Sequence, residues 1–203
     1  MIKVGVTGGI GSGKSTVCHV WEELGAFVVY ADELAKKLMA EDEQLKKQII
    51  SSFGKESYHA DGSLNRAFLA REAFQKGRTE RLNRIVHPAV SLKVEELAEY
   101  AESQGVQLFA EEAALLLKKG RPEFFDVIVL VTADAEKRIQ RVQNRDNIST
   151  DEVVSRMEHQ QNFEELISLC DYVIHNNTTL DDLQEKAAEL YQKILRVHIS
   201  QYT

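Results

Sequence analysis

The chain alternates between short, continuous hydrophobic runs and longer segments whose hydrophobic positions recur at spacings of three and four. Five runs are rich in β-branched or aromatic residues, namely 2–7, 26–31, 106–110, 126–132 and 171–175. Continuous hydrophobicity is typical of strands buried on both faces, as in a parallel sheet. Because helical patterns separate these runs, the sequence predicts a doubly wound α/β fold with a mainly parallel five-stranded sheet.

The clearest helical pattern lies near the C-terminal end. Its hydrophobic positions are Leu180, Leu183, Ala187, Leu190, Ile194 and Val197. This spacing predicts an amphipathic helix. Two pairs resemble capping boxes that begin helices, Ser149 with Glu152 and Thr179 with Asp182.

One long segment, about 32–103, interrupts the alternation of strands and helices. It is rich in helix-forming residues and contains no convincing strand. Folds of this class bind ligands at the carboxyl edge of the sheet. We therefore expect a helical insertion over that edge.

Composition and charge restrict the classes of partner. The 203 residues are 43% hydrophobic and 28% charged, which is ordinary for a globular protein. A net charge of −7 argues against a nucleic-acid-binding protein. No hydrophobic run is long enough to cross a membrane and "MIKVGV" lacks a signal-peptide pattern, so we expect a cytoplasmic protein with no membrane partner. A monomer is compatible with the sequence.

The two cysteines do not form a recognisable metal or redox motif. Cys18 and Cys170 are far apart in the sequence and both have hydrophobic neighbours. We expect both to be small core residues.

The stretch "GGIGSGKS" matches the phosphate-binding P-loop pattern GxxxxGK(S/T). Gly8, Gly13, Lys14 and Ser15 occupy its defining positions, after a predicted strand and before a predicted helix. Glycines allow backbone N–H groups to approach a phosphate, and the positive end of the helix dipole favours the anion. Lysine can reach the β- and γ-phosphates, and the serine hydroxyl can bind Mg²⁺. The sequence therefore predicts a nucleoside triphosphate site.

GTPase switches, ATP-driven motors and small-molecule kinases share this loop. The sequence favours a small-molecule kinase. It has neither the Asp-x-x-Gly nor the Asn-Lys-x-Asp motif of a GTPase. Asp32 follows the second predicted strand, where a carboxylate can orient or deprotonate an acceptor hydroxyl. The alternative is that Asp32 caps the following helix. Glu111 and Glu112 follow the third run and either hold a Mg²⁺-bound water or begin a helix.

Arginines follow the fourth predicted strand. Arg138, Arg141 and Arg145 recur at spacings of three and four in "EKRIQRVQNRD", so one helix face presents three guanidinium groups. Phosphoryl transfer needs cationic donors around the migrating phosphate. The alternative is a solvated basic face that pairs with Glu136 and Asp146. After the fourth strand of a P-loop protein, the pattern favours an arginine-bearing lid.

Motifs along nearly the whole chain resemble the dephospho-coenzyme A kinase family. Residues 5–16 match the family's G-[LV]-T-G-G-I-G-S-G-K-S-T, and "VYADELA" is similar to its "I-D-A-D-x-[IL]-A". "FGKESYHADGSLNRAFL", "RLNRIVHPAV", "DVIVLVTADAEKRIQRVQNRDNIS" and "DYVIHNN" are similar to further family motifs. Tyr30 stands where the family has a first aspartate, and Ala114 and Lys118 replace a proline and a glutamate of "E-A-P-L-L-F-E-x-G".

The resemblance implies a P-loop kinase that phosphorylates the ribose 3′-hydroxyl of dephospho-coenzyme A, with ATP as donor and Mg²⁺. It implies Lys14, Asp32 and Arg141 as catalytic residues. The implied ATP-binding residues are Gly8, Gly11, Ser12, Gly13, Lys14, Ser15, Thr16, Arg141, Arg145 and Asn176. The implied acceptor-binding residues are Thr7, Asp32, Arg66, His87 and Glu112. Mg²⁺ would be bound by Ser15, with Asp32 or Glu112 as candidates to hold it through water.

The expected organisation has three parts. Residues 1–31, 104–140 and 168–203 form the nucleotide-binding core, 32–103 the acceptor domain and 141–167 the lid. From the residues alone, His87 before Pro88 is either an acceptor contact or a packed histidine at a helix end, and Asn176 either contacts adenine or forms a turn. A kinase for another small acceptor, such as a nucleoside or nucleotide, and a nucleotide-dependent regulatory module remain alternatives.

Overall fold

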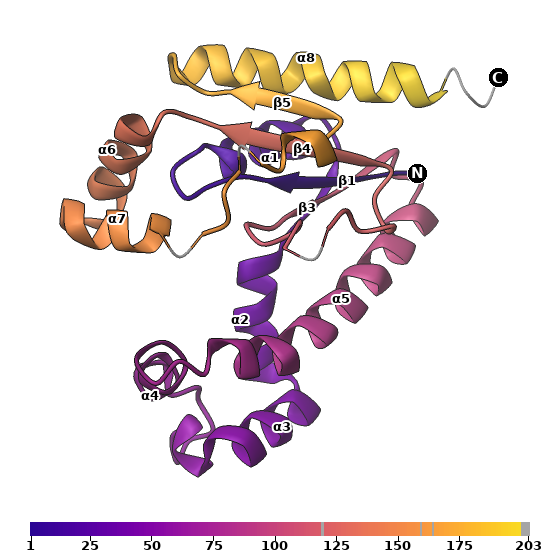
Figure 1. Ribbon diagram of the computed structural model, residues 1–203. Coiled ribbons are helices and arrows are strands. Elements are labelled where there is room, and N and C mark those ends of the chain that lie inside the picture. The colour runs from indigo at the N-terminus through magenta and orange to yellow at the C-terminus, as the bar shows by residue number, and fades with distance from the viewer. Residues whose placement is uncertain (119, 159, 164, 200–203) are drawn as a thin grey trace. The chain divides into compact units, whose positions relative to one another are not determined.

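A computed structural model describes residues 1–118, 120–158, 160–163 and 165–199 (Figure 1), apart from the side chains of residues 74, 75 and 199. Residues 159 and 164 of the predicted lid, and residues 119 and 200–203 of the predicted core, lie outside the described residues. The chain forms two compact units. Unit 1 comprises Met1–Val29 and Tyr100–Thr203, and unit 2 comprises Tyr30–Glu99.

Unit 1 contains a five-stranded sheet in the order β2-β3-β1-β4-β5. The strands are β1 (Ile2–Thr7), β2 (Phe27–Tyr30), β3 (Leu108–Glu112), β4 (Val127–Thr132) and β5 (Tyr172–His175). β1 pairs in parallel with both β3 and β4, and β4 pairs in parallel with β5. The predicted fold class is confirmed. The third strand extends beyond the predicted run, because Glu111 and Glu112 pair with Gly5 and Val6.

Two helices cover one face of this sheet (Figure 1): α1 (Lys14–Glu23) and α8 (Leu180–Ile199). Trp21 of α1 is fully buried, and its indole N–H donates to the carbonyl of Ala187 on α8 at 2.8 Å. The Tyr191 hydroxyl donates to the carbonyl of Leu24 at 3.0 Å. These bonds satisfy polar groups of aromatic side chains whose rings pack inside the unit.

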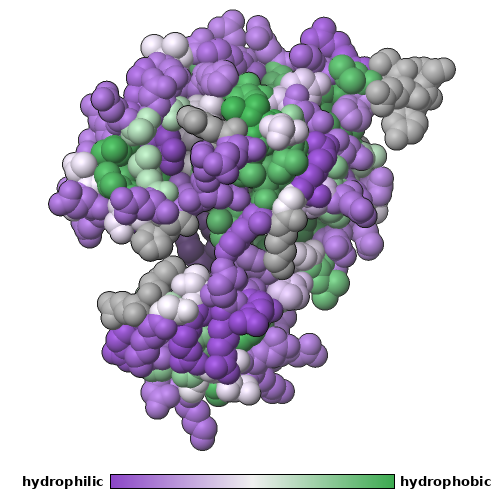
Figure 2. All heavy atoms as spheres, in the orientation of Figure 1, coloured by the Kyte–Doolittle hydropathy of each residue, from purple (hydrophilic) through white to green (hydrophobic). Residues whose placement is uncertain are grey.

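The predicted hydrophobic stripe of α8 is buried in its middle and exposed at its ends. Leu183, Ala187, Leu190 and Ile194 are buried, whereas Leu180 and Val197 are exposed. The outer side of α8, at the top of Figure 2, is covered mainly by hydrophilic residues. The helix is therefore amphipathic, as predicted, but its terminal turns extend past the hydrophobic contact.

A hydrophobic cluster packs on the other face of the sheet. It contains Leu117, Phe125 and Ile128, with Leu116 and Phe124 packed against it. Because both faces are covered, Val127–Val131 of β4 are all buried. This is the physical basis of the continuous hydrophobic runs in the sequence.

The rest of unit 1 contains α6 (Ala135–Asp146), α7 (Thr150–Glu158) and the 3₁₀ turn η3 (Ile167–Leu169). The capping box before α7 is confirmed. The Ser149 backbone N–H donates to the Glu152 carboxylate at 3.0 Å, and the Glu152 N–H donates to the Ser149 hydroxyl at 3.3 Å. At α8, the Asp182 N–H donates to the Thr179 hydroxyl, while the Asp182 carboxylate binds Thr178 and Lys186.

Unit 2 is helical. Its elements are α2 (Ala31–Glu41), α3 (Glu43–Phe53), the 3₁₀ turn η1 (Lys55–Ser57), α4 (Arg66–Ala70), the π-helical turn η2 (Arg71–Gln75) and most of α5 (Thr79–Ser103). An isolated bridge joins Tyr58 to Leu64. Leu45, Ile49 and Phe53 of α3 form part of its buried interior. Unit 2 covers most of the segment that the sequence predicts as an insertion.

Two further predictions concern the cysteines and the membrane. Cys18 is fully buried, Cys170 is partly buried, and both are free thiols. Burial raises the pKa of both thiols, which fits small packed residues. Within the described part of the chain, no helix is long and hydrophobic enough to span a membrane.

Candidate active site

The P-loop connects the carboxyl end of β1 to the first turn of α1. Gly13 has φ +103°, and a Cβ at this position would overlap the side-chain amide of Asn176. Only glycine combines this left-handed backbone with so close a neighbour. α1 begins at Lys14, so the positive end of its dipole lies at the loop.

Lys14, Ser15 and Glu112 form one polar cluster at the end of β1 and β3. The Lys14 side chain is buried, and its Nζ lies 3.6 Å from Glu112 Oε1 and 3.4 Å from the carbonyl of Gly9. The Ser15 hydroxyl donates to Glu112 Oε2 at 2.9 Å. A buried ammonium requires such a partner. The structure thus brings together three residues that the sequence placed in the same site.

The donor set of this cluster fits Mg²⁺. Ser15 and Glu112 provide a hydroxyl and a carboxylate within hydrogen-bond distance of each other, and Mg²⁺ prefers oxygen ligands. Among the described residues there is no group of three or more His, Cys, Asp or Glu side chains that could hold a metal. A P-loop does not need one, because nucleotide phosphates and water supply the other ligands. Glu111 and Glu112 belong to a strand, so the expectation that they begin a helix is wrong.

Other predicted loop residues are packed into the fold. Thr7 and Ser12 are fully buried. The Thr7 hydroxyl lies 3.5 Å from the carbonyl of Ala114. The Ser12 hydroxyl has no hydrogen-bond partner among the described residues. An unsatisfied buried hydroxyl inside a phosphate loop is consistent with a site built to bind a polar ligand.

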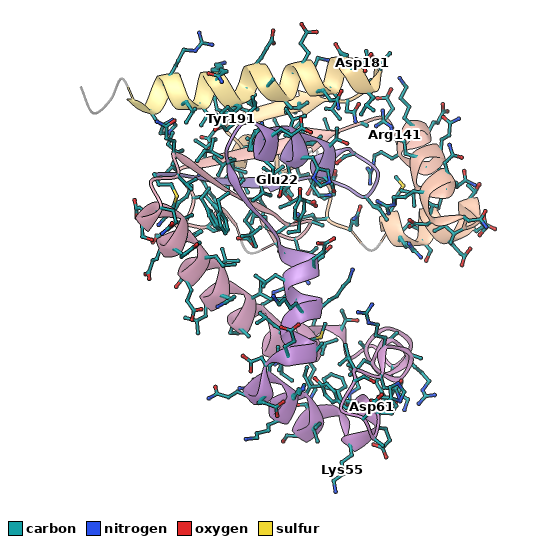
Figure 3. All side chains as sticks on the ribbon, turned by 180° about the vertical axis from the view of Figure 1, so that it is seen from behind. Glu22, Lys55, Asp61, Arg141, Asp181 and Tyr191 are labelled. Carbon is teal, nitrogen blue, oxygen red and sulfur yellow. The ribbon has the colours of Figure 1, made fainter. Side chains whose placement is uncertain are left out.

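Arg141 of α6, labelled in Figure 3, contacts both the P-loop and Asn176. One guanidinium nitrogen, Nη2, donates to the backbone carbonyl and the side-chain oxygen of Asn176, both at 3.1 Å. Nη1 lies 3.4 Å from the carbonyl of Gly11. Asn176 is buried and donates from Nδ2 to the carbonyl of Ser12 at 2.8 Å. Asn176 therefore joins the end of β5, the P-loop and Arg141.

The three arginines of α6 have different surroundings. Arg138 donates from Nε to the carbonyl of Ile10 at 2.9 Å, so it also contacts the P-loop. The side chain of Arg145 is 62% exposed and pairs with Asp146 at 2.7 Å, which raises its pKa. The predicted arginine helix is confirmed. The solvated alternative describes only Arg145, because Arg138 and Arg141 bind the loop.

The sequence did not distinguish Glu111 from Glu112. Glu111 neighbours Glu112 on β3 but points to the other face of the sheet, since side chains alternate along a strand. Burial raises the pKa of its carboxyl to about 7. No hydrogen bond to this carboxyl is present within the described part of the chain. A glutamate in this state costs folding free energy when it ionises.

Three predicted site residues lie in unit 2. Asp32 is exposed in the first turn of α2, whose N-cap is Tyr30, so the alternative of Asp32 as N-cap is wrong. Arg66 is exposed at the first position of α4. His87 is exposed inside α5, so the alternative of a packed histidine at a helix end is wrong. Their assignment to the acceptor stays a prediction.

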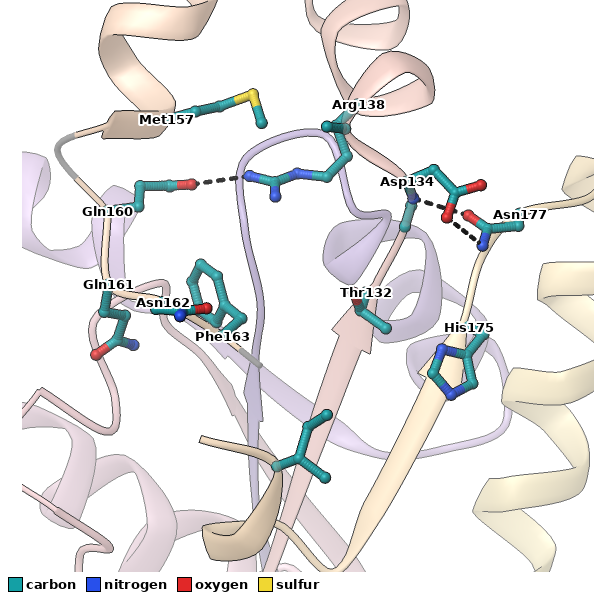
Figure 4. Close-up of a pocket in the computed structure, with 13 residues that line it drawn as sticks. Thr132, Asp134, Arg138, Met157, Gln160, Gln161, Asn162, Phe163, His175 and Asn177 are labelled. Carbon is teal, nitrogen blue, oxygen red and sulfur yellow. Dashed lines mark hydrogen bonds between the residues drawn. The ribbon is translucent and has the colours of Figure 1, made fainter. Parts of the chain in front are cut away.

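A cavity of about 660 Å³ lies beside β4, β5 and α6 in unit 1. Figure 4 shows Arg138 and Gln160 on one side of it and Asp134, Asn177 and His175 on the other. The Asp134 N–H donates to the Asn177 side-chain oxygen at 2.8 Å. Gln160 also accepts a hydrogen bond from the P-loop. No local pattern in the sequence indicates this contact with Ile10, which joins residues 150 positions apart.

Comparison with known proteins agrees with this geometry. A family model described as dephospho-CoA kinase matches residues 2–182. The chain belongs to the dephospho-CoA kinase family. A dephospho-CoA kinase from Salinibacter ruber is 48% identical over 192 residues, which cover 94% of this chain and 96% of the relative. One from Corynebacterium diphtheriae is 36% identical over 191 residues, covering 94% and 96%.

Solved structures show the same fold. The protein TT1252 from Thermus thermophilus superposes with a TM-score of 0.75 at 30% identity, covering 100% of this chain and 98% of that one. A dephospho-CoA kinase from Campylobacter jejuni gives a TM-score of 0.63 at 24% identity, covering 95% and 96%. The predicted P-loop kinase fold and the predicted family are therefore confirmed.

Proposed function

We propose that the chain transfers the γ-phosphoryl group of ATP to the ribose 3′-hydroxyl of dephospho-CoA, giving ADP and CoA in the last step of CoA biosynthesis. The observation that carries this proposal is the P-loop with its buried Lys14 in a chain that matches the dephospho-CoA kinase family over residues 2–182. The chain is thus a phosphotransferase. A cytoplasmic location stays a prediction.

The donor residues all belong to unit 1. Backbone N–H groups of the loop, including those of Gly8, Gly11 and Gly13, and the first turn of α1 with Thr16 bind the ATP phosphates. Lys14 places a buried positive charge beside them. Ser15 would hold Mg²⁺, with Glu112 or Asp32 as candidates to hold it through water, and the ion would offset charge on the phosphates. Arg141 acts on the transferring phosphate, and Arg145 joins it by leaving its exposed pair with Asp146. Asn176 and Ser12, whose hydroxyl has no partner among the described residues, bind ATP.

The acceptor residues lie mostly in unit 2. Asp32 orients the 3′-hydroxyl and accepts its proton, while the hydroxyl oxygen bonds to the γ-phosphorus and the bond from that phosphorus to ADP breaks. Arg66 and His87 of unit 2 are proposed to bind dephospho-CoA, and Thr7 and Glu112 of unit 1 are each proposed as further acceptor contacts. In this proposal residues 32–103 form the acceptor domain and 141–167 a lid that limits ATP hydrolysis by water.

The test measures ADP release with a panel of acceptors: dephospho-CoA, adenosine and nucleoside monophosphates. We expect turnover with dephospho-CoA to exceed that with each other acceptor. Turnover with a nucleoside or nucleotide instead would support the alternative kinase, which the family match does not favour. ATP binding without acceptor-stimulated turnover would identify a regulatory module and overturn the proposal.

A further inference from the structure

Two side chains from distant parts of the sequence hold Ile10, at the tip of the P-loop. The Ile10 N–H donates to Gln160 Oε1 at 3.0 Å, and the Ile10 carbonyl accepts from Arg138 Nε at 2.9 Å. The same guanidinium donates from Nη2 to Gln160 Oε1 at 3.1 Å (Figure 4). Gln160 lies beyond α7, and Arg138 lies on α6. We call this arrangement of Ile10, Arg138 and Gln160 the Ile10 clasp.

The loop is shaped to admit the clasp. A Cβ on Gly9 would overlap the Arg138 guanidinium, and a Cβ on Gly11 would lie 2.6 Å from the Arg138 carbonyl. The guanidinium therefore lies directly against the loop backbone. Its partial burial lowers the pKa of Arg138, because lost hydration disfavours the charged guanidinium.

The cavity beside the clasp makes hydrogen bonding the main restraint on these side chains. Arg138 and Gln160 both line the space of about 660 Å³, so packing leaves room for other rotamers. In a well-packed core, neighbouring atoms would select one rotamer instead. Here the three hydrogen bonds select it, and they fix both backbone polar groups of Ile10.

We propose that Arg138 and Gln160 are positioning residues that hold the first turn of the P-loop in its phosphate-binding conformation. The inference rests on the proposed ATP site. Neither residue is assigned a contact with the phosphates. A loop whose amide groups are already oriented binds an anion without first being ordered, and a looser loop loses affinity. The effect acts on ATP and not on the acceptor.

The first test compares Gln160→Met with Gln160→Glu. Methionine removes the acceptor of both hydrogen bonds, whereas a carboxylate keeps it. We expect Gln160→Met to raise the Kd for Mg·ATP, measured by calorimetry without acceptor, by about tenfold, which corresponds to one net hydrogen bond. The KM for ATP should rise in parallel, and the KM for dephospho-CoA should not change. Gln160→Glu should retain most of the affinity.

The matched control is Gln143→Met. The Gln143 side chain donates to the Thr150 hydroxyl at 3.0 Å and so joins α6 to α7 without touching the P-loop. A general loosening of this region would affect both glutamine variants, whereas positioning of the loop predicts a change in ATP affinity for Gln160→Met alone. Melting temperatures of the free proteins confirm that each variant is folded.

The guanidinium provides a second test. Arg138→Lys keeps the positive charge but lacks the planar fork that binds Ile10 and Gln160 together. Because Arg138 and Gln160 act through the same hydrogen bonds, their effects on ATP affinity should not add. The Kd of the double variant for Mg·ATP should exceed that of the weaker-binding single variant by no more than about twofold. If Gln160→Met does not fold, Gln160→Asn, which is one methylene shorter, replaces it with the same expectation.

Failure of the clasp and failure of the proposed function give different results. If the wild-type protein does not bind Mg·ATP, the proposed function is overturned. If it binds Mg·ATP and a folded Gln160→Met protein binds equally well, only the clasp is overturned. A rise in the KM for dephospho-CoA, with ATP affinity unchanged, also overturns the clasp.

Discussion

Lys14 is the residue on which the donor site depends most directly. It is buried beside Glu112, so the fold already accommodates a charge that a phosphate can share. We expect Lys14→Ala to lower kcat by about 10²-fold or more, because a preorganised cation at the transferring phosphate is lost. Steady-state kinetics with dephospho-CoA measures this. Lys193→Ala, on the exposed side of α8, is the control, and near-normal activity of Lys14→Ala would contradict the P-loop assignment.

Glu111 gives stability a pH dependence of its own. Its folded-state pKa of about 7 is above the ordinary value of 4.5, so the folded protein holds this proton more tightly than the unfolded chain does. The cost is absent below pH 4.5, grows as pH rises to 7 and is fully present above it. We expect Glu111→Gln to raise the melting temperature at pH 8 and to change it little at pH 4.5. Thermal unfolding across this range measures the difference.

The exposed Glu123 on the same unit supplies the control for that experiment. Glu123→Gln removes one negative charge without removing a buried carboxyl. A pH-dependent gain that both variants share would assign the effect to net charge and contradict the role of Glu111.

At the scale of helices and strands, the sequence predicted the elements well and their contacts poorly. Strands were predictable because both sheet faces are buried, which leaves continuous hydrophobic runs. The end of β3 was missed because Glu111 and Glu112 are polar, although they pair with β1. The spacing of Arg138, Arg141 and Arg145 predicted one helix, but not that only the first two bind the loop.

Arg141 makes contacts between α6 and other elements, and its substitution should change the kinetics. Its guanidinium binds Asn176 and approaches Gly11, so α6 is attached both to the loop and to the residue that follows β5. We expect Arg141→Ala to lower kcat more than it weakens ATP binding, because the lost cation acts mainly on the transferring phosphate. Single-turnover rates and calorimetry of Mg·ATP separate the two effects. A larger change in ATP affinity than in kcat would make Arg141 a ground-state contact.

For the whole molecule, local patterns located the P-loop but not the residues that support it. A phosphate loop has a characteristic spacing, so Gly8, Gly13, Lys14 and Ser15 could be recognised directly. Gln160 could not be, because its contact with Ile10 joins residues 150 positions apart and no local spacing records such a contact. Asn176 was placed at the site, yet its buried bonds to Ser12 and Arg141 depend on the tertiary fold.

The proposed reaction assigns ATP to residues of unit 1 and the proton of the acceptor hydroxyl to Asp32 of unit 2. Asp32 and Glu33 are exposed neighbours in the first turn of α2, where each carboxylate interacts favourably with the positive end of the helix dipole. Only Asp32 is assigned to the hydroxyl proton. We expect Asp32→Asn to lower kcat by about 10²-fold or more with little change in the KM for ATP, and Glu33→Gln to change neither. If kcat is unchanged in Asp32→Asn, or falls equally in both variants, Asp32 acts only as a charge at the start of a helix.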